Sequence, residues 1–426
     1  MTEPGPSASR QSAVRTALAG LIGNVLEWFD FAVYGYFVSA IGKQFFPSDD
    51  PAAQQLFAYG GFAIGFFARP VGSIVLGKVG DRIGRRALLT LSIALMGGAT
   101  LVIGLLPTYD QIGVAAPVLL VLMRLVQGFS LGGEFTGSMV YTTELASPLM
   151  RGLVSSSTSA GVTLGFILGL ASALFVGEVL SAEEAAAWGW RLPFIASVLF
   201  CVAGWFLRKG IDESSHAHKA AAMRAPILAS LLADWRPIVQ TFGIVGMTNA
   251  AYYLVFTFAV ERRKSMSVES GSTFLLASMV SLGVVLFAKP LGGWISDRVG
   301  RRRLMIALTV VMLALIYVAV RLMLYGSWAE FMLGQILLGV PIGMALGMQG
   351  AMLVESFPLR TRITSMSVAY SITLALSGGV APLVATWLIQ ISGEPLLPAF
   401  YIMLYGVIGL ALMWPMKETN HRSLDD

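Results

Sequence analysis

The sequence predicts an all-α membrane protein whose twelve transmembrane helices form two six-helix halves. The first observation behind this prediction is composition. Of the 426 residues, 56% are hydrophobic and 12% are charged, and the mean hydropathy is +0.74. Soluble domains carry about 25% charged residues. Half that share, with apolar runs along the whole chain, indicates an integral membrane protein.

Twelve apolar runs are the second observation, because a membrane span needs about 20 mostly apolar residues. The expected spans cover 17–42, 54–77, 87–107, 114–143, 152–177, 190–208, 237–260, 271–295, 303–324, 328–355, 363–391 and 396–415. They divide the chain into a tail (1–16), an N-terminal half (17–207), a polar connector (208–236), a C-terminal half (237–416) and a second tail (417–426).

An internal repeat is the third observation. The stretch "GKVGDRIGRR" (Gly77–Arg86) reappears as "GWISDRVGRR" (Gly293–Arg302), about half the chain length later. A second echo relates "ELASPLMR" (Glu144–Arg151) to "ESFPLRTR" (Glu355–Arg362). Two parallel six-helix halves around a central site are typical of secondary transporters.

The distribution of charge gives an orientation. If both termini are cytoplasmic, most of the 29 basic residues fall on the inner side of the membrane, as the positive-inside rule requires. The net charge of +5 therefore reflects topology and does not indicate nucleic-acid binding.

Several chemistries are excluded by what the chain lacks. The single cysteine, Cys201, allows no disulfide framework, and the three histidines lie in polar segments, so we expect no histidine-built metal centre in the membrane. No phosphate-binding G-x-x-x-x-G-K-[ST] loop occurs. The stretch "GFSLG" (Gly128–Gly132) fits the G-x-S-x-G hydrolase pattern, but it lies inside a span without a histidine base. We therefore expect no enzyme, no cofactor and no nucleotide.

Several motifs together resemble one family. The loop G-x-x-x-D-R-x-G-R-R, present twice, resembles the signature of the major facilitator superfamily. The stretches "EWFDFAVYG", "ARPVG", "RLVQGFSLGGEFTG" and "WGWRLPF" resemble its metabolite:proton symporter branch. The resemblance covers about Thr16 to Met416. It implies proton-coupled uptake of a small metabolite across the cell inner membrane, and we expect the protein to work as a monomer.

The same resemblance assigns a gating role to the repeated loops. In the family this loop latches the two halves on the cytoplasmic side. The implied latch consists of Asp81, Arg82, Arg85 and Arg86, with Asp297, Arg298, Arg301 and Arg302 as its echo and Glu144, Arg151, Glu355 and Arg362 as partners. A solvated charge cluster that only sets topology is the alternative.

The first span carries two acids within an apolar run. On a helix, Asn24, Glu27, Asp30, Phe31 and Tyr34 fall within an arc of about 120°. One interpretation is a structural ion pair that locks helix packing. The other is a proton or substrate site that lines a cavity, because ionisable groups inside a membrane usually mark transport pathways.

The fourth span carries a complementary cation. Helical spacing places Arg124, Gln127 and Glu134 within an arc of roughly 80°. An unpaired charge is unfavourable there, so Arg124 is expected to meet Glu27 or Asp30. Either this pair is permanent, or a substrate carboxylate displaces the protein's own. Glu134 lies among small residues, where proton coupling and helix packing are both open.

Other polar groups complete the candidate site. Arg69, about 13 Å into the second span, either reaches the cytoplasmic interface or joins the substrate and proton network. The C-terminal half lacks a deep acid or arginine, and Lys289 is expected near its inner end. Its candidates for cavity contacts are Asn249, Tyr252, Tyr253, Gln335 and Gln349.

The predicted function is symport of protons with a small carboxylate-bearing metabolite. Local resemblance favours a zwitterion such as proline or betaine, whose amine the aromatic rings would hold by cation–π contacts. A mono-, di- or tricarboxylate is the alternative solute, and a gradient-independent facilitator is the alternative mechanism. The expected partners are the solute, protons and the lipid bilayer, without nucleic acid.

Overall fold

The computed structural model describes residues 6–83, 85–208, 227–266, 271–420 and 422–424. Of these, it describes the backbone alone at 6–16, 19–20, 23, 26, 77–78, 80–83, 85–89, 200, 203–208 and 271. Within the described ranges every regular element is a helix.

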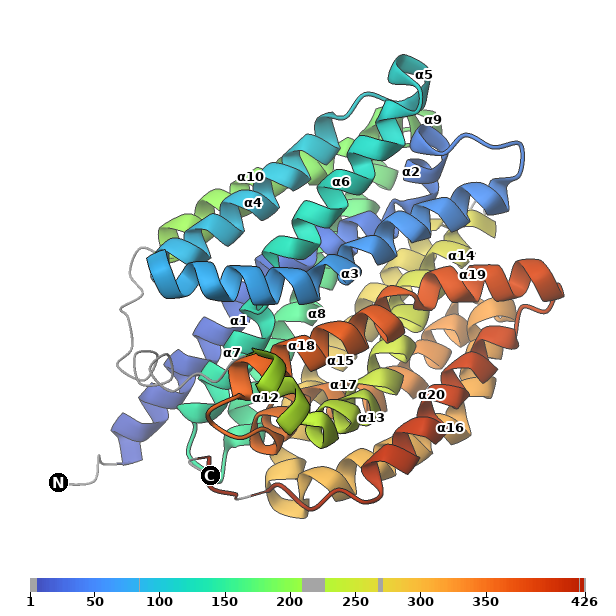
Figure 1. The fold of residues 1–426 in the computed structure, drawn as a ribbon. Coiled ribbons are helices and arrows are strands. Elements are labelled where there is room, and N and C mark those ends of the chain that lie inside the picture. Colours follow the sequence, from blue (N-terminus) through green and yellow to red (C-terminus); the bar gives the residue numbers. More distant parts are fainter. Residues whose placement is uncertain (1–5, 84, 209–226, 267–270, 421, 425–426) are drawn as a thin grey trace.

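Six membrane-crossing segments form the N-terminal half. They are α1 (Pro6–Tyr36) continued by α2 (Val38–Phe45), α3 (Pro51–Ile83), α4 (Arg85–Leu105), α6 (Ala115–Ser130) continued by α7 (Glu134–Glu144), α8 (Arg151–Val179) and α10 (Arg191–Arg208). Short helices α5 (Tyr109–Ile112) and α9 (Ala182–Glu184) lie at the opposite end of the molecule from the described end of the chain (Figure 1).

Six segments also form the C-terminal half. They are α13 (Trp235–Tyr253) continued through a π-helical stretch (Leu254–Phe258) by α14 (Ala259–Met266), α15 (Gly271–Val299), α16 (Arg301–Tyr325), α17 (Trp328–Ser356), α18 (Arg362–Leu374) continued through a π-helical stretch (Ala375–Gly379) by α19 (Ala381–Ser392), and α20 (Leu397–Met413). The start of α1 and the described end of the chain lie at one end of the molecule, here called the terminal end. The end with α2, α5, α9 and α14 is called the distal end (Figure 1).

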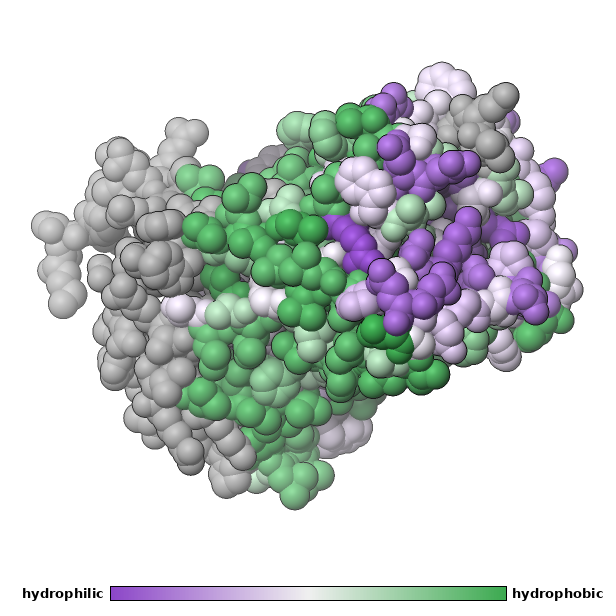
Figure 2. All heavy atoms as spheres, turned by 90° about the horizontal axis from the view of Figure 1, so that it is seen from above, coloured by the Kyte–Doolittle hydropathy of each residue, from purple (hydrophilic) through white to green (hydrophobic). Residues whose placement is uncertain are grey.

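The outer surface matches a lipid environment. Eight helices of the described chain are long and apolar enough to cross a membrane, and two shorter apolar helices (Thr90–Leu105 and Leu397–Met413) accompany them. Figure 2 shows a broad hydrophobic band across one face, bordered on one side by a hydrophilic surface. Large apolar side chains such as Phe175, Leu199 and Phe287 are exposed on the outer surface, where lipid tails would cover them. The predicted all-α, twelve-helix architecture is confirmed.

Three local features differ from the expected spans. The fourth span is broken, because Gly133 has φ +97° and separates α6 from α7. The helices also extend further than expected into both repeated loops: α3 continues to Ile83, and α15 continues to Val299 before a turn at Gly300 with φ +106°. Within the expected connector, α12 (Ile227–Ala233) is helical.

Candidate functional site

Close packing of α3 against α6 positions the buried arginine of the fourth span. A Cβ at Gly128 would lie 1.6 Å from the carbonyl oxygen of Gly65, and one at Gly132 would lie 2.1 Å from the amide nitrogen of Ser73. Glycine is required at both positions because the two backbones touch. The stretch "GFSLG" is thus a helix-packing motif, and its hydrolase-like spacing has no catalytic meaning here.

Arg124 is fully buried and bound by neutral groups. Its guanidinium donates to the carbonyl oxygens of Gly61 and Phe62 at 3.2 Å each and to Oε1 of Gln127 at 2.8 Å. Its Cζ atom also lies 4.3 Å from the ring centroid of Tyr34 and 4.5 Å from that of Phe31. The expected direct ion pair with Glu27 or Asp30 is absent from the described side chains, because these acceptors already occupy the guanidinium.

A chain of hydrogen bonds connects Arg124 to Asp30 instead. Gln127 Nε2 donates to the hydroxyl oxygen of Thr100 at 2.7 Å, and that hydroxyl donates to Oδ2 of Asp30 at 2.7 Å. We call Arg124, Gln127, Thr100 and Asp30 the relay. It joins α6, α4 and α1 and is buried throughout. Asp30 is the carboxylate of the relay, and no cation among the described side chains contacts it directly.

Glu27 has a different partner. Arg69 Nη2 lies 3.4 Å from Oε1 of Glu27, and both side chains are buried. The Arg69 guanidinium also lies over the ring of Trp28, with its carbon 5.1 Å from the ring centroid. Arg69 therefore does not reach the interface by extending its side chain, and that interpretation is wrong. In the described contacts, the two acids of the first span have different partners.

An aromatic cluster lies where the halves meet. The ring of Tyr253 contacts those of Phe62, Phe66 and Phe166, with centroids 5.6 to 5.9 Å apart. Tyr252 extends the cluster through Phe166 at 5.1 Å. The N-terminal half supplies the phenylalanines, and the C-terminal half supplies the tyrosines. Tyr253 thus lies close to the relay through Phe62, whose ring centroid is 5.6 Å from Arg124, while Tyr252 joins it only through Tyr253 and Phe166.

The remaining predicted residues take more local partners. Asn24 donates to the hydroxyl of Ser138 on α7 at 2.9 Å, and Tyr34 donates to the carbonyl of Ala58 on α3 at 3.0 Å. Asn249 donates to the carbonyl of Val245 in its own helix. The expected single polar face of the first span therefore contacts several neighbouring helices.

Three other predicted groups are placed as follows. Glu134 begins α7 and is partly exposed; the turn before it breaks the helical register on which its alignment with Arg124 depended. The amides of Gln335 and Gln349 donate to backbone carbonyls of Val255 and Ile244.

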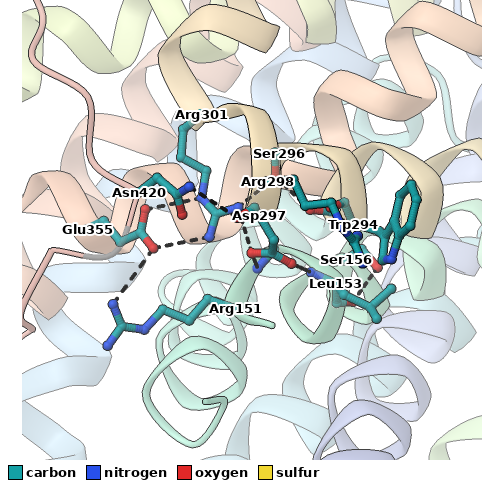
Figure 3. Close-up of polar contacts among 12 residues, drawn as sticks. Arg151, Leu153, Ser156, Trp294, Ser296, Asp297, Arg298, Arg301, Glu355 and Asn420 are labelled. Carbon is teal, nitrogen blue, oxygen red and sulfur yellow. Dashed lines mark hydrogen bonds and ion pairs between the residues drawn. The ribbon is translucent and has the colours of Figure 1, made fainter. Parts of the chain in front are cut away.

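At the terminal end, Asp297 joins the two halves (Figure 3). Its carboxylate accepts hydrogen bonds from the backbone N–H groups of Gly152 and Leu153 at 2.8 and 2.9 Å. These groups lie in the first turn of α8, where helical N–H donors lack intrahelical partners and attract negative charge. The backbones also touch, since a Cβ at Gly293 would lie 2.4 Å from the carbonyl oxygen of Gly152.

Arg301 anchors this aspartate. Its guanidinium lies 2.7 Å from Asp297 and pairs with both oxygens of Glu355 at 3.2 Å, while Arg151 approaches Glu355 at 3.9 Å (Figure 3). A second cross-half ion pair joins Arg362 to Glu144 at 2.7 Å. We call these contacts the terminal layer; it contains Glu144, Arg151, Gly152, Leu153, Gly293, Asp297, Arg301, Glu355 and Arg362.

Other residues of the implied latch do not join the terminal layer. Arg298 lies over the ring of Trp294 at 3.6 Å, and Arg302 donates to the carbonyls of Met413 and Trp414, so both contact their own half. The described conformation therefore gives them no contact with the other half, and their role in the latch stays a prediction. The side chains of Asp81, Arg82, Arg85 and Arg86 lie outside the described residues.

The distal end has a second cross-half contact that sequence reasoning missed. Glu261 on α14 accepts a hydrogen bond from the backbone N–H of Ser39 at 3.3 Å, and Lys264 donates to the carbonyl of Tyr36 at 3.0 Å. The two side chains also pair with each other at 3.4 Å. We call Tyr36, Ser39, Glu261 and Lys264 the distal layer. Cross-half contacts therefore exist at both ends of the site.

Two further buried groups were missed or misplaced. Thr100 carries no sequence signal, because a threonine in an apolar run is ordinary. Lys289 is fully buried between the halves rather than near the inner end: its ammonium donates to the carbonyl of Ser159 on α8 and lies 5.7 Å from the ring centroid of Tyr252. The sequence did contain a signal for the position of Lys289. The stretch "AKPLG" (Ala288–Gly292) echoes "ARPVG" (Ala68–Gly72), so Lys289 is the counterpart of Arg69.

The described residues contain no group of three or more His, Cys, Asp or Glu that could hold a metal ion. Their buried polar groups are donors, acceptors and charges arranged along the meeting surface of the halves. Such an arrangement can bind a small charged or zwitterionic solute and a proton.

Comparisons with known proteins agree with this architecture. Residues 16–225 match the family model for sugar (and other) transporters, and residues 266–424 match that of the Major Facilitator Superfamily. The proline/betaine transporter of Salmonella typhimurium is 32% identical over 422 residues, which cover 95% of this chain and 84% of that protein. The citrate-proton symporter of Klebsiella pneumoniae is 33% identical over 391 residues, covering 91% and 88%.

Solved structures share the fold. The proton:xylose symporter XylE bound to 6-bromo-6-deoxy-D-glucose superposes with a TM-score of 0.75 at 16% identity, covering 98% of each chain. A partially occluded inward open conformation of XylE from E. coli gives a TM-score of 0.76 at 17% identity, covering 96% of this chain and 99% of that one. At this identity the likeness concerns the fold alone.

Proposed function

The chain belongs to the major facilitator superfamily, and from this premise we propose that it is a proton-coupled symporter that imports a small carboxylate-bearing metabolite. A zwitterion such as proline or betaine is the preferred solute, since relatives at 32% identity over most of the chain are proline/betaine transporters. A carboxylate of the citrate type is the second candidate, favoured by the citrate-proton symporter among the relatives.

The relay is the observation that carries this proposal. A buried carboxylate without a directly bound cation is costly when ionised, so a proton is a favourable partner for Asp30. Protonation of Asp30 changes the acceptor that Thr100 faces, and the change passes through Gln127 to Arg124. Proton binding and the orientation of the Arg124 guanidinium are then coupled through hydrogen bonds.

The aromatic cluster supplies the second element of solute binding. Tyrosine and phenylalanine rings attract quaternary or secondary ammonium groups through their electron-rich faces. A zwitterion placed against Tyr253 and Phe66 would have its carboxylate near the buried cations. Because the described halves touch at both ends of this cluster, the proposal assigns the described conformation to an occluded state of the transport cycle.

The proposal includes an orientation and a set of partners. Both termini, the connector (208–236) and the terminal layer face the cytoplasm, as the excess of basic residues favours. The halves comprise 17–207 and 237–416, and the protein functions as a monomer in the cell inner membrane. The proposal includes no cofactor, because the proton gradient drives transport, and no nucleic-acid partner.

Uptake into proteoliposomes tests this function. An inward proton gradient should accumulate radiolabelled proline or betaine above equilibrium, and a protonophore should abolish the accumulation. Accumulation of citrate but of neither zwitterion would favour the second candidate. Equilibration that ignores the proton gradient would identify a facilitator and refute the proton coupling.

A further inference from the structure

Lys289 is a buried cation that neither the relay nor the layers use. It lies on α15 about 12 Å along the helix from Asp297, at 1.5 Å per residue. Its side chain is fully buried. An ammonium group has three N–H donors, and the structure gives it one hydrogen bond, to the backbone carbonyl of Ser159 across the halves. Among the described residues, no carboxylate forms an ion pair with it.

Its counterpart in the other half is Arg69. Both residues precede a proline inside the second helix of their half, Pro70 in α3 and Pro290 in α15. The first helix of the N-terminal half presents the carboxylate of Glu27 to Arg69 at 3.4 Å. The first helix of the C-terminal half, α13, presents the ring of Tyr252 to Lys289 at 5.7 Å. An aromatic ring thus takes the place of the acid.

This asymmetry has an energetic consequence. A buried charge without a counter-charge costs several kcal/mol, and a carbonyl dipole and a ring face compensate less than a carboxylate does. Among the described cations of the central region, Arg69 is paired with an acid, although its Nε and Nη1 atoms have no hydrogen-bond partner, and Arg124 donates three hydrogen bonds to neutral acceptors. Lys289 is therefore the cation that gains most from an incoming anion.

Lys289 also borders the aromatic cluster. Tyr252, whose ring it faces, contacts Phe166 at 5.1 Å and Tyr253 at 5.9 Å. A solute held against these rings has Lys289 within the same contact network. The hydrogen bond to Ser159 joins α15 to α8, so a ligand that replaces this carbonyl changes a cross-half contact.

We propose that Lys289 binds the carboxylate of the transported solute and so makes the central site selective for carboxylate-bearing molecules. The proposal deepens the proposed function and rests on it. It assigns the binding of the solute carboxylate to the C-terminal half, whereas the relay that binds the proton belongs to the N-terminal half. The solute carboxylate is then the counter-charge of Lys289, just as Glu27 is the counter-charge of Arg69.

Binding to the purified full-length chain tests the proposal with matched ligands. Glycine betaine is compared with choline, and proline with prolinamide, because each pair differs in the carboxylate; citrate is a further carboxylated probe. Affinities are measured for wild type, Lys289→Met and Lys289→Arg. Lys43→Met, an exposed lysine on α2, is the matched control.

In Lys289→Met we expect affinity for the carboxylated ligand to fall at least about tenfold, while affinity for its carboxyl-free analogue stays unchanged. Lys289→Arg keeps the charge and retains the preference for the carboxylated member. The melting temperature of ligand-free Lys289→Met should equal or exceed that of wild type, because an uncompensated buried charge is removed. Lys289→Gln replaces the methionine variant if that protein does not fold.

Two results would overturn the inference while the proposed function stands. One is a Lys289→Met protein that keeps wild-type affinity and preference. The other is an equal loss of affinity for both members of a pair together with a lower melting temperature, which identifies a structural lysine. Wild-type protein that binds none of the carboxylated probes contradicts the proposed function itself and the inference with it.

Discussion

Glu27 and Asp30 lie one helical turn apart on α1, yet they have different partners. Glu27 forms an ion pair with Arg69, whereas Asp30 accepts a hydrogen bond from Thr100 and has no cation of the described chain bound to it directly. Removing one member of a buried ion pair strands the other charge. Replacing Asp30 by asparagine leaves no buried cation without its ion-pair partner. The two acids should therefore respond differently to neutral substitution.

Asp30→Asn should separate exchange from accumulation. The amide resembles a permanently protonated carboxyl and still offers an oxygen to Thr100, so the variant should fold and exchange solute across the membrane. Counterflow should remain within about threefold of wild type, while uptake driven by a pH gradient should fall at least about tenfold, or ~1.4 kcal/mol. Both are measured in proteoliposomes. Full proton-driven accumulation by this variant would show that Asp30 does not couple the fluxes.

Glu27→Gln should instead destabilise the protein. Its loss leaves Arg69 buried and unpaired, at a cost of about 3–5 kcal/mol for a buried pair. The melting temperature should fall, and the double variant Glu27→Gln/Arg69→Gln should recover part of the loss, because the stranded charge is gone. Thermal unfolding of purified Glu27→Gln, Arg69→Gln and the double variant measures the coupling. A double variant less stable than either single one would contradict a closed structural pair.

At the scale of elements, α8 and α15 cross by backbone contact. A Cβ at Gly293 would lie 2.4 Å from the carbonyl oxygen of Gly152, closer than side chains and backbone tolerate. A Cβ at Gly283, on the same helix, would have no neighbouring atom within 4 Å. The crossing brings Asp297 to the first turn of α8, so the terminal layer depends on the absence of a side chain at Gly293.

Gly293→Ala should therefore slow transport. The added methyl group separates α8 from α15, weakens the hydrogen bonds of Asp297 to Gly152 and Leu153, and disfavours closure at the terminal end. We expect the initial uptake rate to fall at least about tenfold with normal expression. Gly283→Ala should leave the rate unchanged. Equal rates for both variants would mean that closure does not need this crossing.

The elements themselves were predictable from the sequence to different degrees. Span length and apolarity identify all twelve crossings, because each depends on a local property of about 20 residues. The break at Gly133 was missed, since a positive φ there is compatible with an ordinary glycine-rich span. Lys289 was misplaced because α15 continues as a helix beyond the expected end of its span, which moves the lysine deeper.

Partners were harder to predict than elements. Helical periodicity placed Asn24, Glu27 and Asp30 on one face, but which neighbouring helix meets each side chain depends on packing. The close contact of Gly128 with Gly65 fixes where Arg124 lies, and the carbonyls that bind it carry no signature in the sequence. The distal layer uses backbone atoms of Tyr36 and Ser39, which any residues could provide.

For the whole molecule, the two layers act against each other. Alternating access requires the terminal layer to open while the distal layer is closed, and the reverse. In the described conformation both sets of contacts exist, so each contributes to the balance between the open states. A ligand or substitution shifts this balance by its differential effect on the states. Weakening one layer should bias the protein toward opening at that end.

Asp297→Asn and Lys264→Met should therefore compensate each other. Asp297→Asn weakens the terminal layer because the amide lacks the charge that α8 and Arg301 bind. Lys264→Met removes the contact with Tyr36 and weakens the distal layer. Each single variant should transport about tenfold more slowly, as one open state becomes overpopulated. The double variant should return to within about threefold of wild type, measured as initial uptake into proteoliposomes. If the layers are independent structural contacts, the two losses will multiply, and the double variant will be slower than either single one.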